Sequence, residues 1–312
     1  MEHYSSIVHH CYNAILKRDP EPEALQGAAL AMFHGLSLED FLNNLLHSPE
    51  YQTLSGRDSG FSGFTPVCAD LGERRLWIDL SDMAVSRVCL GGNYEPHETA
   101  FVRRHLAAGD TFLDIGANIG WFTTLAAGIV GAEGAVHAFE PRDETRGLLT
   151  RSISDNGFEG RVTVHDFALA AEAQSTRLLW MQGTHNPGGS RLARDADDAY
   201  EGMTGQSVNT RALDDLEFSG RVTLVKLDVE GGEANVLRGA RAFLARHRPL
   251  ILTEVGEVAL EHVSNTTLAQ YAELVDGLGY RIHALEGDGT GRELGVGDLT
   301  SEHPFNVVLT PK

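Results

Sequence analysis

The chain has 312 residues with 44 acidic and 25 basic side chains, and its net charge of −19 disfavours nucleic-acid partners, whose phosphates carry the same sign. Hydrophobic residues make up 42% and charged residues 22% of the chain, close to globular averages, which argues against intrinsic disorder. We see no apolar run of the roughly 18 residues that a membrane span needs, no leader-like N-terminus and no paired cysteines, and therefore expect an acidic cytoplasmic protein.

Residues 1–56 are predicted to form an all-helical accessory domain. Apolar residues recur at helical spacing over 7–16 and again over 24–33. Ser37, followed by Asp40 three residues later, resembles the N-terminal cap of a third helix. A core of this size is marginal alone, so we expect these helices to pack against the rest of the chain.

A glycine- and serine-rich stretch at residues 55–60 is the best candidate for a domain boundary. Residues 57–95 are predicted to hold a linker and short strands, one of them over 75–80. They lead into a larger domain, residues 96–312.

From residue 96 onward, predicted helices and strands alternate. Helices are expected over 98–107, 121–130, 143–154, 233–245 and 267–278, and strands over 111–114, 135–140, 161–166, 222–228, 250–254, 280–285 and 305–309. Such alternation is typical of parallel strands joined by crossover helices. The fold class is therefore α/β, with a doubly wound sheet.

Each of the five predicted core strands ends in an acidic residue: Asp114, Glu140, Asp166, Asp228 and Glu254. Ligands of open parallel sheets bind at the carboxyl ends of the strands. A single acidic residue there is explained equally well as the cap of the following helix. Five carboxylates on one edge would repel one another, so together they favour a ligand with positive charge and several hydrogen-bond donors.

The segment from Asp114 to Gly120, which reads DxGxNxG, follows a strand and opens a helix, and Glu140 lies 20 residues further on. This is the layout of a nucleotide-cofactor fold, in which the later acid accepts hydrogen bonds from ribose hydroxyls. The Asp114 carboxylate would oppose a pyrophosphate, whereas S-adenosylmethionine combines a ribose with a cationic sulfonium and ammonium. Asp166 would then face the adenine amine. A dinucleotide site and a non-binding fold are the alternatives.

Several motifs in order resemble the FkbM-type S-adenosylmethionine-dependent methyltransferases. They are Phe112–Trp121, Ala138–Pro141, Val225–Ala240, Arg248–Glu254 and Phe305–Pro311, with Tyr94-Glu95 at the family's usual opening. The resemblance implies a class I methyltransferase, Rossmann-like sheet with strand order 3-2-1-4-5-7-6 and an antiparallel last strand. Gly232 departs from the family, which more often has alanine there.

The resemblance also implies methyl transfer from S-adenosylmethionine, usually to a hydroxyl oxygen of a sugar, polyketide or related molecule. The methionine part would be bound by Asp114, Gly116, Asn118 and Gly120, the ribose by Glu140 and the adenine by Asp166. Tyr94, Glu95 and Asp228 complete the expected cofactor site.

Methyl transfer to oxygen requires alignment of the acceptor and removal of one proton. Lys226 and Asp228 share one face of a predicted strand and should be neighbours, either as a structural ion pair or as catalytic groups. Glu230 and Glu254 are further candidates for the base, whereas Glu233 is expected to be structural at a helix start. Asp228, Glu230 and Glu254 could also hold Mg²⁺ or Ca²⁺, with a metal-free site as the alternative.

A glycine-rich loop, residues 183–190, lies in a region, 182–206, that matches no motif. We expect it to cover the cofactor edge as a lid, because long insertions at such positions are commonly functional. His185 and Ser190 are candidate acceptor contacts, although a lone loop histidine is more often simply solvated.

The helical segment has a resemblance of its own. Leu16–Ala24 and Leu46–Tyr51 resemble a small domain of unknown function that is related to phycobilisome-linker helices. That domain occurs attached to bacterial glycan-modifying enzymes, which hints at a carbohydrate context.

The leading hypothesis is a cytoplasmic O-methyltransferase that acts on a sugar, a glycan precursor or a polyketide-like natural product. One alternative is a nicotinamide-dependent oxidoreductase on the same type of sheet, and another is a non-enzymatic interaction protein. A small-molecule or glycan acceptor is the expected partner, without nucleic acid or a membrane span. A homo-oligomer is compatible with the sequence.

Overall fold

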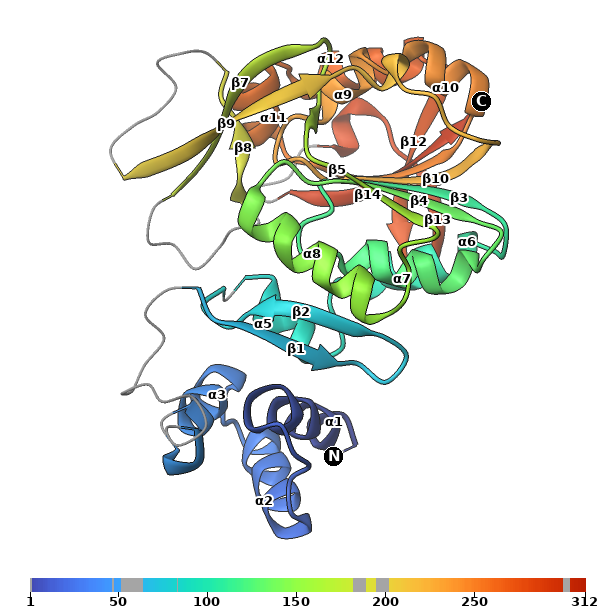
Figure 1. The fold of residues 1–312 in the computed structure, drawn as a ribbon. Coiled ribbons are helices and arrows are strands. Elements are labelled where there is room, and N and C mark those ends of the chain that lie inside the picture. Colours follow the sequence, from blue (N-terminus) through green and yellow to red (C-terminus); the bar gives the residue numbers. More distant parts are fainter. Residues whose placement is uncertain are drawn as a thin grey trace. The chain divides into compact units, whose positions relative to one another are not determined.

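The computed structural model describes residues 2–46, 48–51, 64–82, 84–181, 189–194, 202–299 and 304–312. Its elements separate into two units, Met1–Tyr94 and Glu95–Lys312 (Figure 1). Among the helices in these ranges, none is long and apolar enough to cross a membrane.

The first unit combines the predicted helices with a β-hairpin. Its elements are α1 (Glu2–Cys11), a π-helical turn (Tyr12–Leu16), α2 (Pro22–Phe33), α3 (Leu38–Leu46), β1 (Pro66–Asp70), β2 (Arg75–Asp79) and α5 (Ser86–Leu90). β1 and β2 pair antiparallel. The cap predicted for α3 is confirmed, because the Asp40 amide donates to Ser37 Oγ at 3.0 Å.

An eight-stranded sheet forms the centre of the second unit, in the order β13-β12-β14-β11-β10-β3-β4-β5. The bounds are β3 (Thr111–Ile115), β4 (Ala135–Phe139), β5 (Val162–His165), β10 (Val222–Leu227), β11 (Leu250–Val255), β12 (Tyr280–Glu286), β13 (Gly289–Glu293) and β14 (Phe305–Pro311). The strands from β5 to β11 are parallel, and β14 is antiparallel to both of its neighbours. Without β13, the order is the predicted 3-2-1-4-5-7-6. β12 and β14 pair antiparallel, although β13 lies between them along the chain.

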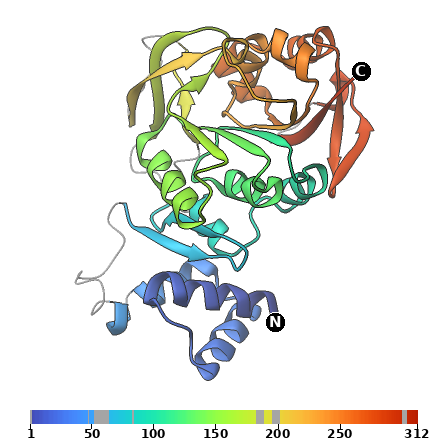
Figure 2. The ribbon, with the colours of Figure 1, turned by 45° about the vertical axis from the view of Figure 1, so that its right-hand side comes forward.

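Helices cover both faces of this sheet (Figures 1 and 2). One face carries α6 (Pro96–His105), α7 (Trp121–Val130) and α8 (Asp143–Asp155), and the other carries α9 (Glu233–Arg238), α10 (Arg241–His247), α11 (Glu257–Ser264) and α12 (Leu268–Gly277). The single helix predicted over 233–245 is wrong, because it divides at Gly239. A Cβ there would lie 2.3 Å from the carbonyl oxygen of Ala170, so the backbone passes unusually close to the chain that follows β6.

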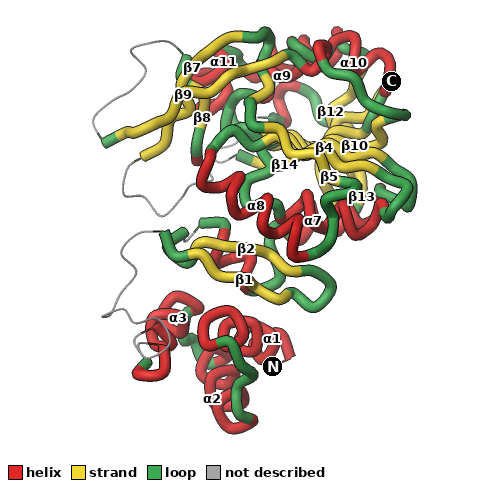
Figure 3. The backbone as a smooth tube through the Cα atoms, viewed as in Figure 1, coloured by secondary structure: helices red, strands yellow, loops and turns green. Residues whose placement is uncertain are grey.

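A second, four-stranded sheet lies beside the first and has the order β6-β9-β7-β8 (Figure 3). Its strands are β6 (Ala168–Leu169), β7 (Gln174–Met181), β8 (Arg191–Leu192) and β9 (Met203–Arg211). Most of the loop predicted as a lid, residues 183–190, lies outside the described residues, so this expectation stays a prediction. His185 lies outside the described residues.

The segments that follow β3 and β10 approach each other closely at the edge of the sheet where both strands end. Gly116 has a φ of 85°, and a Cβ built on it would lie 1.8 Å from the carbonyl oxygen of Asp228. Only glycine satisfies both conditions. The two chain segments that follow β3 and β10 therefore touch through their backbones.

Replacing Gly116 with alanine is expected to lower the free energy of unfolding by about 1–3 kcal/mol, because the methyl group forces these segments apart and strains φ. Gly128 provides a matched control, since it is exposed within α7 and a Cβ built on it would have no other atom within 4 Å. Gly128→Ala should stabilise by about 0.5–1 kcal/mol through helix propensity. Urea unfolding measures both, and equal effects would contradict this account.

Candidate functional site

The loop between β3 and α7 makes a sharp turn through left-handed backbone conformations. Gly116, Asn118 and Gly120 have φ values of 85°, 51° and 93°. The Asn118 side chain stabilises its own unusual conformation, because its Oδ1 accepts the Ile119 amide at 2.8 Å. The loop thus presents backbone rather than side chains at the carboxyl end of β3.

Glu140 follows β4 directly and is only 7% exposed. Its two carboxylate oxygens accept the amides of Asn118 at 2.9 Å and of Arg142 at 2.8 Å. Burial raises the pKa of Glu140 to about 7, although these hydrogen bonds favour the ionised form. The side chain is therefore fixed where the first two strand-end loops meet.

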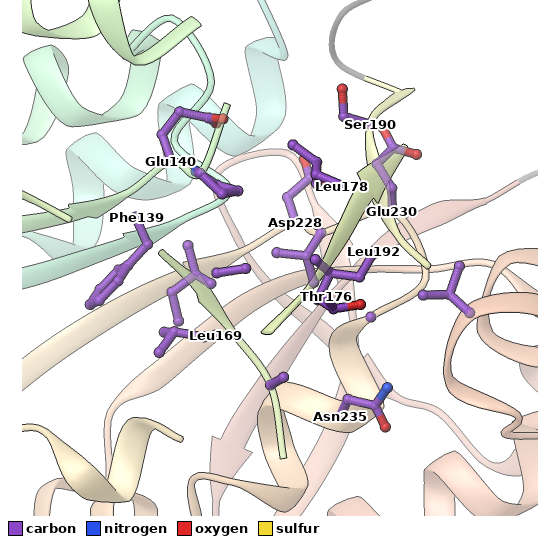
Figure 4. Close-up of a pocket in the computed structure, with 18 of the residues that line it drawn as sticks. Phe139, Glu140, Leu169, Thr176, Leu178, Ser190, Leu192, Asp228, Glu230 and Asn235 are labelled. Carbon is purple, nitrogen blue, oxygen red and sulfur yellow. The ribbon is translucent and has the colours of Figure 1, made fainter. Parts of the chain in front are cut away.

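A cavity of about 1020 Å³ opens at the carboxyl ends of β3, β4 and β10. The strand-end wall includes Gly116, Asn118, Glu140, Asp228 and Glu230. Figure 4 shows residues of β7 and β8 on the same cavity, together with Ser190 just before β8. Both sheets therefore contribute to one pocket.

The sequence predicts a strand over 176–181, which lies within β7, but not that this strand lines the site. Gln174, Thr176 and Leu178 of β7 line the cavity, and they alternate as residues on one face of a strand do. Leu178 pairs in register with Leu192 of β8, which also lines the cavity. The period-2 spacing in β7 was the available signal.

Lys226 is the buried cation of the site, with 2% exposure. Its Nζ lies 2.7 Å from Asp228 Oδ2 and 3.6 Å from Glu95 Oε2, so the predicted Lys226–Asp228 neighbourhood is confirmed. In the strand register Lys226 is beside Asp114. Burial alone would lower the pKa of Lys226, but the carboxylates of Asp228 and Glu95 raise it above its usual value. Lys226 is therefore a permanent positive charge.

Contrary to the prediction, Asp114 does not face the cavity. It is 1% exposed within β3, and its Oδ2 accepts from Thr123 Oγ1 of α7 at 2.5 Å. Burial raises its pKa to about 6. Since Asp114 lies behind the wall, the charge facing a ligand comes from Glu140, Asp228 and Glu230 instead.

Glu230 and Glu254 have carboxyl groups that are difficult to ionise. Burial, reinforced by the negative charge of Asp228, raises the pKa of Glu230 to about 8 and that of Glu254 to about 7. Glu230 lines the cavity and Glu254 does not. Glu233 is structural as predicted, because its Oε1 accepts the amides of Val229 at 2.9 Å and Gly231 at 3.3 Å.

The remaining predicted site residues are more dispersed. Asp166 is exposed and lines a neighbouring polar hollow with Asp143 and Arg146, away from the cavity wall that holds Glu140. Gly120 shapes the loop but is not on the wall, and Tyr94 is the last residue of the first unit.

A divalent cation at Asp228, Glu230 and Glu254 is not supported. Within the described ranges, no group of three or more histidine, cysteine, aspartate or glutamate side chains is arranged to hold a metal ion. The ammonium group of Lys226, 2.7 Å from Asp228, already provides the positive charge there.

Comparison with known proteins gives a family match. A model described as "Methyltransferase FkbM domain" matches residues 114–282. No curated protein matches the chain.

Among solved structures, the chain is similar to the methyltransferase FkbM from Methylobacillus flagellatus KT, with 16% identity, 96% of this chain and 58% of that chain covered, and a TM-score of 0.41. It is also similar to a putative rRNA-methylase from Clostridium thermocellum, with 14% identity, coverage of 68% and 92%, and a TM-score of 0.42. M. jannaschii TYW2 in complex with AdoMet has 14% identity, coverage of 81% and 87%, and a TM-score of 0.43.

Replacing Lys226 with methionine should remove the charge that compensates Asp228 and Glu95. We expect a loss of about 3–5 kcal/mol in unfolding free energy, because a buried carboxylate loses its partner. Arg281→Met, which breaks an exposed ion pair with Glu293, should cost less than about 1 kcal/mol. Chemical unfolding of both variants tests this expectation, which a Lys226→Met protein as stable as the control would contradict.

The raised carboxyl pKa values make stability fall with rising pH. The folded chain keeps protons that the unfolded chain has released, so the free energy of unfolding should decrease from about pH 6.5 to about pH 8.5. The groups responsible are Asp114, Glu140, Glu230, Glu233 and Glu254. The partly buried His165, whose pKa is lowered to about 4, titrates below this window.

Glu230 has the highest pKa of these carboxyl groups, so Glu230→Gln should reduce the fall in the free energy of unfolding above about pH 7.5. The exposed Glu172→Gln variant should follow the parent protein. Urea unfolding at several pH values measures the slopes. A parent protein that becomes more stable across this window would contradict the assignment.

Proposed function

Because this chain belongs to the FkbM methyltransferase family, it is an S-adenosylmethionine-dependent methyltransferase, and we propose that its acceptor atom is a hydroxyl oxygen of a sugar, glycan precursor or similar natural product. The observation that carries the proposal is the single cavity that joins the strand-end loops to a wall with mixed polar and apolar side chains. The loops supply the cofactor side and the second sheet supplies the acceptor side.

The residues present fit S-adenosylmethionine. Gly116 lets the loops after β3 and β10 meet in one wall, and Glu140 offers carboxylate oxygens to ribose hydroxyls. Asp228 places negative charge on the same wall, and Glu230 adds to it when it ionises, so a sulfonium and an ammonium are stabilised there and a pyrophosphate is repelled. This charge favours the methyl donor over a nicotinamide dinucleotide.

Methyl transfer to oxygen needs one proton acceptor beside the acceptor hydroxyl. S-adenosylmethionine, when bound, supplies a methyl group already activated by the sulfonium. Of the four residues considered for catalysis, Asp228 and Glu230 reach the cavity, whereas Lys226 and Glu254 do not line it.

Asp228 is the group we assign as the base. Lys226 holds its Oδ2 at 2.7 Å, and Oδ1 accepts no hydrogen bond from the described residues, which leaves it available to an acceptor hydroxyl. In this assignment Lys226 is a positioning residue. It fixes the direction of the Asp228 carboxylate and stays charged while a proton moves to Oδ1.

The opposite wall suits a carbohydrate-like acceptor. Thr176 and Ser190 supply hydroxyl groups, and Leu178 and Leu192 supply an apolar surface between them. A sugar ring presents hydroxyls at its edge and C–H groups on its faces. The polar side chains can bind the hydroxyls, and the apolar side chains can pack against the C–H groups. The position of Ser190 on the cavity supports the proposal that it contacts the acceptor.

Calorimetric titration with S-adenosylmethionine, S-adenosylhomocysteine and NAD tests the cofactor. We expect binding of the two sulfur compounds and none of NAD. The same protein, incubated with a panel of glycosides and S-adenosylmethionine, should yield products heavier by one methyl group in mass spectrometry. Methylation of amines but not of hydroxyls in matched acceptors would overturn the oxygen assignment.

Asp228→Asn should lower turnover by about 10²–10⁴-fold, because the amide cannot take the proton, while the Kd of S-adenosylmethionine changes much less. Thermal unfolding checks that the variant is folded despite the loss of a partner for Lys226. Glu172→Gln, at an exposed position that does not line the cavity, is the control. Normal turnover in Asp228→Asn would remove Asp228 from the role of base.

A further inference from the structure

We propose that Glu230 is the residue by which the protein distinguishes S-adenosylmethionine from its demethylated product. Its carboxylate would stabilise the positive sulfonium of the donor and gain nothing from the neutral thioether of S-adenosylhomocysteine. The inference rests on the proposed cofactor site and adds a specificity-determining residue to it.

Glu230 is the cavity-wall carboxylate without a committed partner. Asp228 is bound to Lys226, and Glu140 accepts two backbone amides. Glu230 has no hydrogen bond or salt bridge with any residue in the described ranges, although it is partly buried and lines the cavity. A carboxylate in this position is costly unless a ligand supplies its counter-charge.

The backbone holds Glu230 in a conformation that side chains rarely adopt, with a φ of 55°. Gly231 follows with a φ of 95°, and a Cβ on it would lie 2.3 Å from the carbonyl oxygen of Ala259. Glu233 fixes the same turn by accepting the amides on either side of Glu230. Such over-determined strain is typical of functional positions.

The loop that carries Glu230 lies beside the place where the donor's sulfur belongs. In S-adenosylmethionine the sulfur joins the ribose to the methionine chain. Glu140 marks the ribose side and Gly116 the methionine side, and Gly116 packs directly against the Asp228 carbonyl. On this placement, the side chains after β10 are the cavity side chains nearest to the sulfur that joins the two halves of the donor.

The charges around Glu230 oppose its ionisation in a pocket without a cation. Asp228, Glu254 on β11 and Glu233 at the start of α9 each raise the pKa of Glu230 through their negative charge when ionised, while the positive Lys226 on β10 is engaged by Asp228. Glu140 and Arg194 lie on the same cavity. A sulfonium would reverse this balance, so binding of the donor should release a proton from Glu230 near neutral pH, and binding of the product should not.

Titration calorimetry with S-adenosylmethionine and S-adenosylhomocysteine at about pH 7.5 tests the proposal in the full-length chain. Glu230→Gln should lower the ratio of donor to product affinity about tenfold and leave the product Kd within about twofold. Glu172→Gln should leave the ratio unchanged. In the parent protein, titrations in two buffers of different ionisation enthalpy should reveal proton release with the donor alone.

The outcomes separate this inference from the proposed function. If the parent protein binds neither compound, the cofactor site itself fails. If it binds both compounds and Glu230→Gln leaves the ratio of their affinities unchanged, Glu230 does not distinguish the sulfonium from the thioether. If Glu230→Gln does not fold, the two-buffer titration of the parent protein decides, and equal proton release with both compounds overturns the proposal.

Discussion

One buried ammonium group allows this site to contain so many carboxylates. Lys226 lies between Asp228 and Glu95 and beside Asp114 in the sheet, where an uncompensated negative charge would be costly. Its positive charge holds the end of β10 to the start of α6, two segments far apart in the chain. The cation also leaves an excess of negative charge on the cavity wall, because it balances fewer carboxylates than surround it.

A second constraint is steric and acts on the same edge. Because Gly116 has no side chain, the loops after β3 and β10 can touch. The turn at Asn118 and the carboxylates of 228–230 therefore form one surface. Charge and close packing therefore depend on each other here. Moving the loops apart would separate the turn at Asn118 from the carboxylates of 228–230 that Lys226 helps to compensate.

Local patterns in the sequence predicted the glycine turn, the position of Glu140 and the pairing of Lys226 with Asp228, whereas the sheet order was implied by the family resemblance. They could not predict the direction of Asp114, because that depends on Thr123, a hydroxyl on a helix that packs against the strand. The wall from β7 and β8 was also missed. β8 has two residues and forms only through pairing with β7, so no local period reveals it.

The strands that supply this second wall all fall between β5 and β10 along the chain, so the main sheet is complete without them. Side chains facing the cavity from 174–178 and 190–194 can therefore vary without disturbing the hydrogen-bond ladder under the strand-end loops. Such a division would let the side chains of one half of the pocket change while the other half stays constant. Relatives with the same β3 and β10 loops would then differ in what they modify chiefly through the segment between β5 and β10.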